Sequence, residues 1–183
     1  MALSPAQRVQ QRKRAAIAAA AAAPTQTMAN ATVYERHLAK LQQDHLRLKN
    51  VQSEKAKGLL KAQLLPTYAP YIDGVLSAGQ GAQDDVITTL MIWTLDAANY
   101  ARALDMAEYI LAHGLKLPDR FSRTPATLVA EEIANAALAA LKVDEQFDVE
   151  VLLRTLALTA THDMPDQVRA KLHLAIGRAV RAS

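Results

Sequence analysis

Apolar side chains recur at helical spacing along most of the chain, and this pattern predicts a protein built of α-helices. Val86, Leu90 and Trp93 would share one face of a helix, and Val168 and Leu172 would share a face of another. The sequence lacks the β-branched runs between Gly/Pro turns that a β-sandwich or a doubly wound sheet needs. We therefore predict an all-α fold.

The first strongly marked helix start lies about thirty residues into the chain. Thr32 and Glu35 have the spacing of a capping box, which predicts a long helix that runs to about Leu65 and is stopped by Pro66. A 4-3 spacing from Tyr34 gives the first half of this helix a coiled-coil-like seam, which polar residues interrupt in the second half.

This seam is too thin for the long helix to stand alone. It needs another helix against it, either from this chain or from another copy. We expect a homo-oligomer in which the seam makes the contacts. The predicted oligomerisation residues are Tyr34, Leu38, Leu41, His45, Leu48 and Leu59.

After Pro66 the apolar pattern becomes denser and predicts a bundle of shorter helices. They cover about residues 71–78, 84–96, 100–113, 124–141, 148–160 and 163–179. We expect residues 67–181 to form one compact unit. Its predicted core is Val86, Leu90, Trp93, Leu104, Ile110, Leu128, Ile133, Leu152, Leu156, Leu172 and Ile176.

Composition supports helices and suggests three parts. The 183 residues are 51% hydrophobic but only 4% aromatic, so the core must be aliphatic, and alanine and leucine favour helices. Residues 1–29 are predicted to be a basic N-terminal helical arm and linker, 30–65 the long basic helix, and 66–183 an acidic compact helical domain. No apolar run reaches the roughly 18 residues of a membrane span, and we predict no membrane partner.

Charge is divided unevenly between these parts. Eleven lysines and arginines against three acidic residues give residues 1–61 a formal charge of +8, while ten against fifteen give residues 62–183 a charge of −5. A basic segment attracts a polyanion through counterion release, although a solvated helix can carry the same charge. The predicted DNA-binding residues are Arg8, Arg12, Lys13, Arg14, Arg36, Lys40, Arg47, Lys49, Lys55, Lys57 and Lys61.

Signals for catalysis are weak. The sequence has no cysteine, no H-E-x-x-H motif and no phosphate-binding G-x-x-x-x-G-K-[ST] loop, so thiolate chemistry and ATP hydrolysis are not expected. Asp84, Asp85 and Asp96 are the candidates for a Mg²⁺-dependent nuclease site. The competing interpretation is that the two adjacent acids offset the dipole at a helix start. We predict no resident metal or cofactor unless the nuclease hypothesis holds.

Several stretches taken together resemble the small terminase subunit of temperate tailed phages with cohesive DNA ends. No single motif is diagnostic, but the order and spacing of the stretches match over nearly the whole chain. They are residues 4–8, 31–35, 64–66, 74–76, 79–85, 93–96, 123–125, 131–132 and 158–173.

The resemblance implies a subunit that recognises the packaging site on double-stranded viral DNA and presents it to a large terminase subunit, which carries the ATP motor. It also implies a helical homo-oligomer, often a ring, acting in the host cytoplasm. Because the family is also labelled an endonuclease subunit, the alternative is a metal-dependent endonuclease that itself cuts the cohesive-end site. A third hypothesis is an unrelated helical scaffold.

Overall fold

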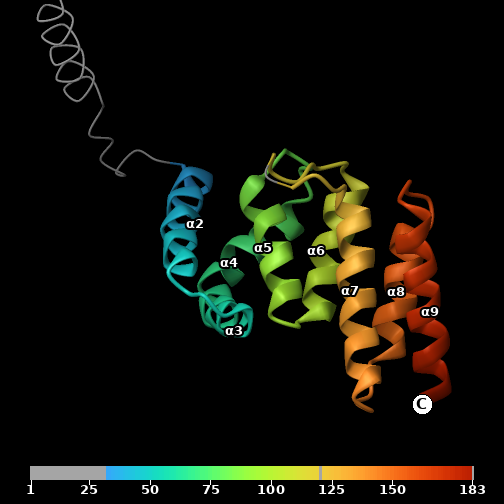
Figure 1. Cartoon of the computed structure of the whole chain (residues 1–183). Helices are drawn as coiled ribbons and strands as arrows, with labels where there is room; N and C mark the ends of the chain where they lie inside the picture. The colour runs from blue at the N-terminus through green and yellow to red at the C-terminus, as the bar shows by residue number, and fades with distance from the viewer. Residues whose placement is uncertain (1–31, 120, 183) are drawn as a thin grey trace, which may run out of the picture. The chain divides into compact units, whose positions relative to one another are not determined.

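A computed structural model describes residues 32–119 and 121–182. The chain divides into two units, residues 1–36 and 37–183. The predicted arm over residues 1–29 lies outside the described part. Within that part every regular element is helical, as predicted (Figure 1). The elements are α2 (Val33–Lys49), α3 (Glu54–Leu64), the 3₁₀-helix η2 (Leu65–Tyr68), α4 (Ala69–Ala78), α5 (Asp85–Asp96), α6 (Tyr100–Ala112), α7 (Pro125–Lys142), α8 (Val149–Thr159) and α9 (Asp166–Ala182).

Helix starts follow the capping signals in the sequence. The predicted capping box is present, since the Thr32 hydroxyl accepts from the Glu35 N–H at 3.2 Å and the Thr32 N–H donates to Glu35 Oε2 at 2.7 Å. The Thr124 hydroxyl accepts from the backbone at the start of α7, and the Asp148 carboxylate does so at the start of α8. Gly114 follows α6 with a φ of +65°, which is the left-handed conformation that ends helices.

The single long helix predicted over residues 32–65 is wrong. α2 ends at Lys49 and α3 begins at Glu54, with a short irregular connection between them. Ser53 is the cause, because its hydroxyl accepts from the Ala56 N–H at 3.3 Å and starts a new helix. Residues 33–64 therefore form two helices instead of one continuous helix.

α5 is the centre of the unit formed by residues 37–183. Every residue from Val86 to Leu95 is buried, and α5 contacts α3, η2, α6 and α7. The last three helices, orange to red in Figure 1, stand side by side, with α9 packed mainly on α7. Most of the predicted core is confirmed. Leu156 and Ile176 are corrections, since both are only half-buried.

A buried carboxylate ties α2 to η2. Asp44 accepts hydrogen bonds from the Tyr68 hydroxyl at 2.7 Å, from Lys40 at 2.9 Å and from Arg47 at 3.0 Å. The Lys40 ammonium also lies 4.8 Å from the centre of the Tyr68 ring. Tyr68 is fully buried, and burial together with the Asp44 carboxylate raises the pKa of its hydroxyl. Its proton therefore stays in place as the hydrogen-bond donor.

A second buried carboxylate starts α5. Asp84 Oδ1 accepts from the N–H groups of Val86 and Ile87 at 2.8 and 3.0 Å, and Oδ2 accepts from the Tyr71 hydroxyl at 2.5 Å. The His37 ring stacks on Tyr71 with centroids 4.3 Å apart. Asp44 and Asp84 thus anchor neighbouring tyrosines, so that the η2–α4 segment is fixed against α2 and α5 at once.

None of the helices in the described ranges is long and apolar enough to cross a lipid bilayer.

Stability should depend on pH through Asp44. Burial opposes its ionisation, but the hydrogen bonds from Lys40, Tyr68 and Arg47 outweigh that effect and hold its pKa below the ordinary value. A lowered folded-state pKa contributes stability above the unfolded pKa of about 4, and that stability is lost as pH falls through the folded pKa. We expect Asp44→Asn to lower the free energy of unfolding by about 1–3 kcal/mol at pH 7, with the difference shrinking below about pH 4.

Urea denaturation at pH 7 and pH 3 measures this difference. Glu54→Gln is the matched control, because Glu54 pairs with Lys57 on the helix surface and is 84% exposed, and such pairs contribute little. A variant Asp44→Asn as stable as the parent at pH 7 would contradict the role given to this carboxylate.

Candidate nucleic-acid interface

The predicted DNA-binding residues divide into three groups in space. Arg8, Arg12, Lys13 and Arg14 lie outside the described residues. Arg36 belongs to the unit of residues 1–36. Lys40, Arg47 and Lys49 lie on α2, and Lys55, Lys57 and Lys61 lie on α3.

Four of these cations already have acidic partners in the chain. Lys40 and Arg47 both bind Asp44. Lys57 pairs with Glu54 at 2.6 Å, and Lys61 pairs with Asp96 at 2.5 Å. Asp44 and Glu54 are already subtracted in the +8, so only the Lys61–Asp96 pair lowers the charge of the segment further. A count over residues 1–61 could not show that pair, because Asp96 is 35 residues from Lys61.

Three exposed cations in the described part of the segment have no acidic partner there. Across residues 32–119 and 121–182, Arg36, Lys49 and Lys55 make no ion pair with an acidic side chain. Lys49 ends α2 and Lys55 lies in the first turn of α3. The connection between α2 and α3 is thus flanked by unpaired positive charge, which suits contact with phosphate groups.

Beside this connection lies a cavity of about 240 Å³, here called the lysine pocket. It brings together three predicted DNA-binding lysines, three predicted core or seam residues, one acidic candidate for the nuclease site, and two apolar residues that the sequence did not single out. Its lining is His45, Leu48, Lys49, Lys57, Lys61, Ile92, Trp93, Asp96 and Phe121. These residues come from four separate segments, so no linear motif could have revealed the pocket.

Close helix packing makes the pocket possible. Gly58 of α3 approaches the end of α5 so nearly that a Cβ at this position would lie 3.1 Å from the Asp96 carbonyl oxygen. The glycine lets α3 come close enough for Lys61 to reach the Asp96 carboxylate. On the α2 side, the His45 ring lies 5.3 Å from the Trp93 ring, centroid to centroid.

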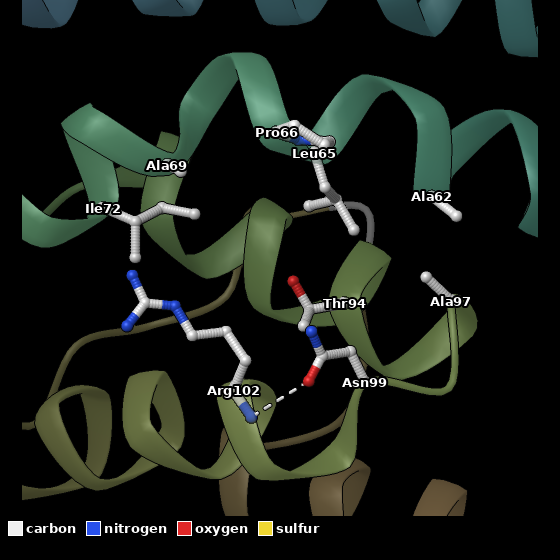
Figure 2. A pocket seen from close by; sticks show the side chains of 9 residues that line it. All are labelled: Ala62, Leu65, Pro66, Ala69, Ile72, Thr94, Ala97, Asn99 and Arg102. Atoms are coloured by element: carbon white, nitrogen blue, oxygen red, sulfur yellow. Dashed lines mark hydrogen bonds between the residues drawn. The ribbon is translucent and has the colours of Figure 1, made fainter.

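A larger cavity of about 400 Å³ has a different character (Figure 2). In Figure 2, Ala62 and Leu65 face Thr94 and Ala97 across it, and the Arg102 side chain extends toward Ile72. The remaining lining residues are Pro66, Ala69 and Asn99. Arg102 is the one cation in this lining, and its guanidinium pairs with Asp73. The cavity is largely apolar and gives no positive charge for a phosphate.

The three acidic candidates for a nuclease site do not converge. Asp84 and Asp96 lie at opposite ends of α5, whose twelve residues span roughly 18 Å at the α-helical rise. Both oxygens of Asp84 are occupied by the α5 backbone and Tyr71, and Asp96 is paired with Lys61. Asp85 accepts from the Gln83 side chain at 3.0 Å. Asp84 caps α5, in line with the interpretation that the two adjacent acids belong to a helix start.

Acidic side chains of α7 lie near the end of α5. Burial raises the pKa of Glu132, and the carboxylates of Asp96 and Glu131 raise it further. Glu131 pairs with Arg123 and with Lys171, the latter at 3.5 Å. Among the described residues no three His, Asp or Glu side chains are arranged to hold a metal ion.

The predicted oligomerisation seam is partly used within the chain. Leu41 and Leu48 are buried in the core of the unit formed by residues 37–183, and His45 contacts Trp93. Leu38 is half-buried. Leu59 is 61% exposed. The sequence allowed the seam to pack either against this chain or against another copy. Leu41 and Leu48 pack against this chain. Tyr34 belongs to the other unit.

Comparison with known proteins identifies relatives of the whole described region. The family model described as phage small terminase subunit matches residues 38–167. The chain is 46% identical to the "Terminase, endonuclease subunit" of Escherichia phage P2 over 179 residues, which is 97% of this chain and 71% of the relative. It is 27% identical to the "Probable terminase, endonuclease subunit" of Haemophilus phage HP1 over 73 residues, 40% of this chain and 26% of that protein. No solved structure matches the chain significantly.

The cap assignment of Asp84 predicts a stability effect without metal. Asp84→Ala removes the cap of α5 and leaves the buried Tyr71 hydroxyl without its acceptor, so the free energy of unfolding should fall by about 2–4 kcal/mol. Asp85→Ala is the matched control and should lower it by less than about 1 kcal/mol through the helix dipole. Urea denaturation measures both values. If Mg²⁺ instead raised the melting temperature of the parent and both variants lost that increase, the metal-site hypothesis would return.

Proposed function

Because the chain belongs to the phage small terminase subunit family, we propose that it recognises the packaging site on double-stranded viral DNA and delivers that DNA to the large terminase ATPase. The supporting observation is the position of Lys49 and Lys55, two exposed cations on either side of the α2–α3 connection that have no ion pair in the described part of the chain. The acidic remainder of the chain repels phosphate. DNA therefore lies along the basic segment, with the arm residues Arg8, Arg12, Lys13 and Arg14 adding contacts.

The division of labour follows from the sequence. The chain has no phosphate-binding loop for ATP, so the energy for packaging comes from the large subunit. The three predicted parts then have separate roles: residues 1–29 and 30–65 hold DNA and other copies, and residues 66–183 form the acidic helical body. The site of action is the host cytoplasm, where viral DNA and the large subunit meet.

We propose that the working form is a homo-oligomer arranged as a ring. Leu46 of α2 and Leu59 of α3 are both 61% exposed, which gives apolar surface for contact with another copy close to the basic residues. Several copies would repeat the basic segments around one DNA molecule and increase avidity without new contacts.

A second candidate function is suggested by the relatives' printed names, which call them terminase endonuclease subunits. In this alternative the chain itself cuts DNA with a bound metal. Asp84 and Asp85 lie at the start of α5 and Asp96 at its end, and all three make other contacts, which favours the DNA-recognition proposal.

Salt dependence tests the DNA-binding proposal. The slope of log K against log [salt] is negative, and each phosphate contact that is lost should reduce its magnitude by about 0.9. We expect the triple variant Arg12→Ala, Lys13→Ala, Arg14→Ala, and separately Lys49→Ala, Lys55→Ala, Lys57→Ala, to bind duplex DNA more weakly and with a shallower slope. Fluorescence anisotropy of labelled duplex between 50 and 200 mM salt, roughly the range over which phosphate contacts dominate, measures both quantities.

The matched control is Lys116→Ala, Lys142→Ala, Arg178→Ala, which removes three exposed positive charges from the acidic body. An equal loss of affinity in this control would show that the basic segment is not the DNA surface. The same DNA incubated with protein and Mg²⁺ or Mn²⁺, without the large subunit, should stay uncut. Cutting that Asp84→Asn together with Asp85→Asn abolishes would establish the endonuclease alternative.

Oligomer formation has a direct test in light scattering. At micromolar concentration we expect a mass that is a multiple of the 19.9 kDa chain. Leu59→Lys should reduce that mass, because it places a charge in the proposed contact. Leu153→Lys on α8, where Leu153 is 43% exposed, should leave it unchanged. A monomer of the parent chain at this concentration would contradict the proposal.

A further inference from the structure

The lining of the lysine pocket holds three lysines and one acidic residue, so it has an excess of positive charge. Lys49 makes no ion pair within the described residues, and Lys57 pairs only with Glu54, which is highly exposed and does not line the pocket. An exposed pair of this kind is weak, so Lys57 can exchange Glu54 for another anion. Lys61 neutralises Asp96, the one acid in the lining. Two lysines are therefore available to a single phosphate group.

Three of the residues that line the pocket carry aromatic rings. Phe121 and His45 are both half-buried. The Trp93 ring lies 5.3 Å from the His45 ring, centroid to centroid, and Trp93 is only 3% exposed. Flat rings beside a group of cations are the features that hold a nucleobase and its phosphate together in proteins that bind single-stranded nucleic acid.

The volume sets what can enter. Pockets for drug-sized ligands range over roughly 300–1,000 Å³, so a cavity of about 240 Å³ is suited to a small ligand. A base pair within a duplex cannot enter, because its bases are stacked on both faces and carry the backbone on both sides. A single nucleotide that is unpaired can present its base to the rings while its phosphate stays at the mouth.

Resting on the DNA-binding function proposed above, we infer that the lysine pocket binds one unpaired nucleotide of a DNA strand. Its phosphate lies between Lys49 and Lys57, and its base lies against Phe121 and His45. The Asp96 carboxylate, held by Lys61, faces the same space and can accept a hydrogen bond from an exocyclic amino group of the base. The chain would then recognise a strand end or an opened base pair in addition to the duplex backbone.

The chain carries its own reporter for this inference. Trp93 is the only tryptophan of the sequence and lines the pocket, so a base entering there should change its fluorescence. The full-length protein is titrated with a single-stranded ten-nucleotide oligodeoxyadenylate and with a mixed-sequence duplex of equal length. We expect the single strand to change Trp93 emission and the duplex to bind without an equal change.

Phe121→Ala should weaken single-strand binding about tenfold, the order of effect seen when a stacking aromatic residue is removed, while duplex affinity changes less than about twofold. Phe147→Ala is the matched control, since Phe147 is the only other phenylalanine, is also half-buried, and contacts Tyr100 away from the pocket. If Phe121→Ala fails to fold by circular dichroism, Phe121→Leu keeps the apolar volume and removes the aromatic face, and should show the same loss.

The outcomes separate this inference from the function on which it rests. Equal single-strand affinity in the Phe121 and Phe147 variants, with duplex binding intact, would overturn the nucleotide pocket and leave DNA binding standing. If the parent protein bound neither the single strand nor the duplex, both the nucleotide pocket and the DNA-binding function would be overturned. Deoxyadenosine monophosphate is the third ligand. If it bound as tightly as the oligonucleotide, the pocket would belong to a free nucleotide and not to a DNA strand.

Discussion

The burial of α5 on all sides is the constraint around which the structure is organised. A helix with apolar residues on every face has no stable place at the surface, so other helices must surround it. Its first N–H groups cannot reach water, and Asp84 satisfies two of them. That carboxylate is itself buried and needs a further donor, which Tyr71 provides. The hydrogen bond from Tyr71 to the α5 cap thus helps to fix the position of α4.

The C-terminal end of α5 forms the contact surface for the basic helix α3. α3 approaches Asp96 closely because Gly58 has no side chain, and Lys61 then neutralises the Asp96 carboxylate. α2 is held through Asp44 and Tyr68. The basic segment is therefore part of the folded body from residue 37 onward and is not a separate rod. Its positive charge is held on packed helices, which suits the DNA contact that we propose.

Ion pairing decides which of the basic side chains are available to an external anion. Lys40, Arg47, Lys57 and Lys61 each have an acidic partner, whereas Lys49 and Lys55 have none among the described residues. The unpaired lysines flank the α2–α3 connection that Ser53 creates. The same break in the helix that prevents a continuous coiled coil brings Lys49 and Lys57 to one pocket. Local capping chemistry thereby shapes the surface that we propose for DNA binding.

Local signals were enough to determine the all-α class, most helix boundaries and most of the core. Thr32, Thr124 and Asp148 cap helices by contacts within a few residues, and apolar spacing in α5 and α9 needs no distant partner to be recognised. The start of α3 at Ser53 was also local, but the polar seam masked it. Long-range partners decided the rest. The partner of Lys61 is 35 residues away, the acceptor for Tyr71 is 13 residues away, and the lysine pocket joins residues from 45 to 121. A periodic pattern specifies which face of a helix is apolar. It cannot specify which helix will cover that face, because contacts between distant segments exist only after the chain has packed.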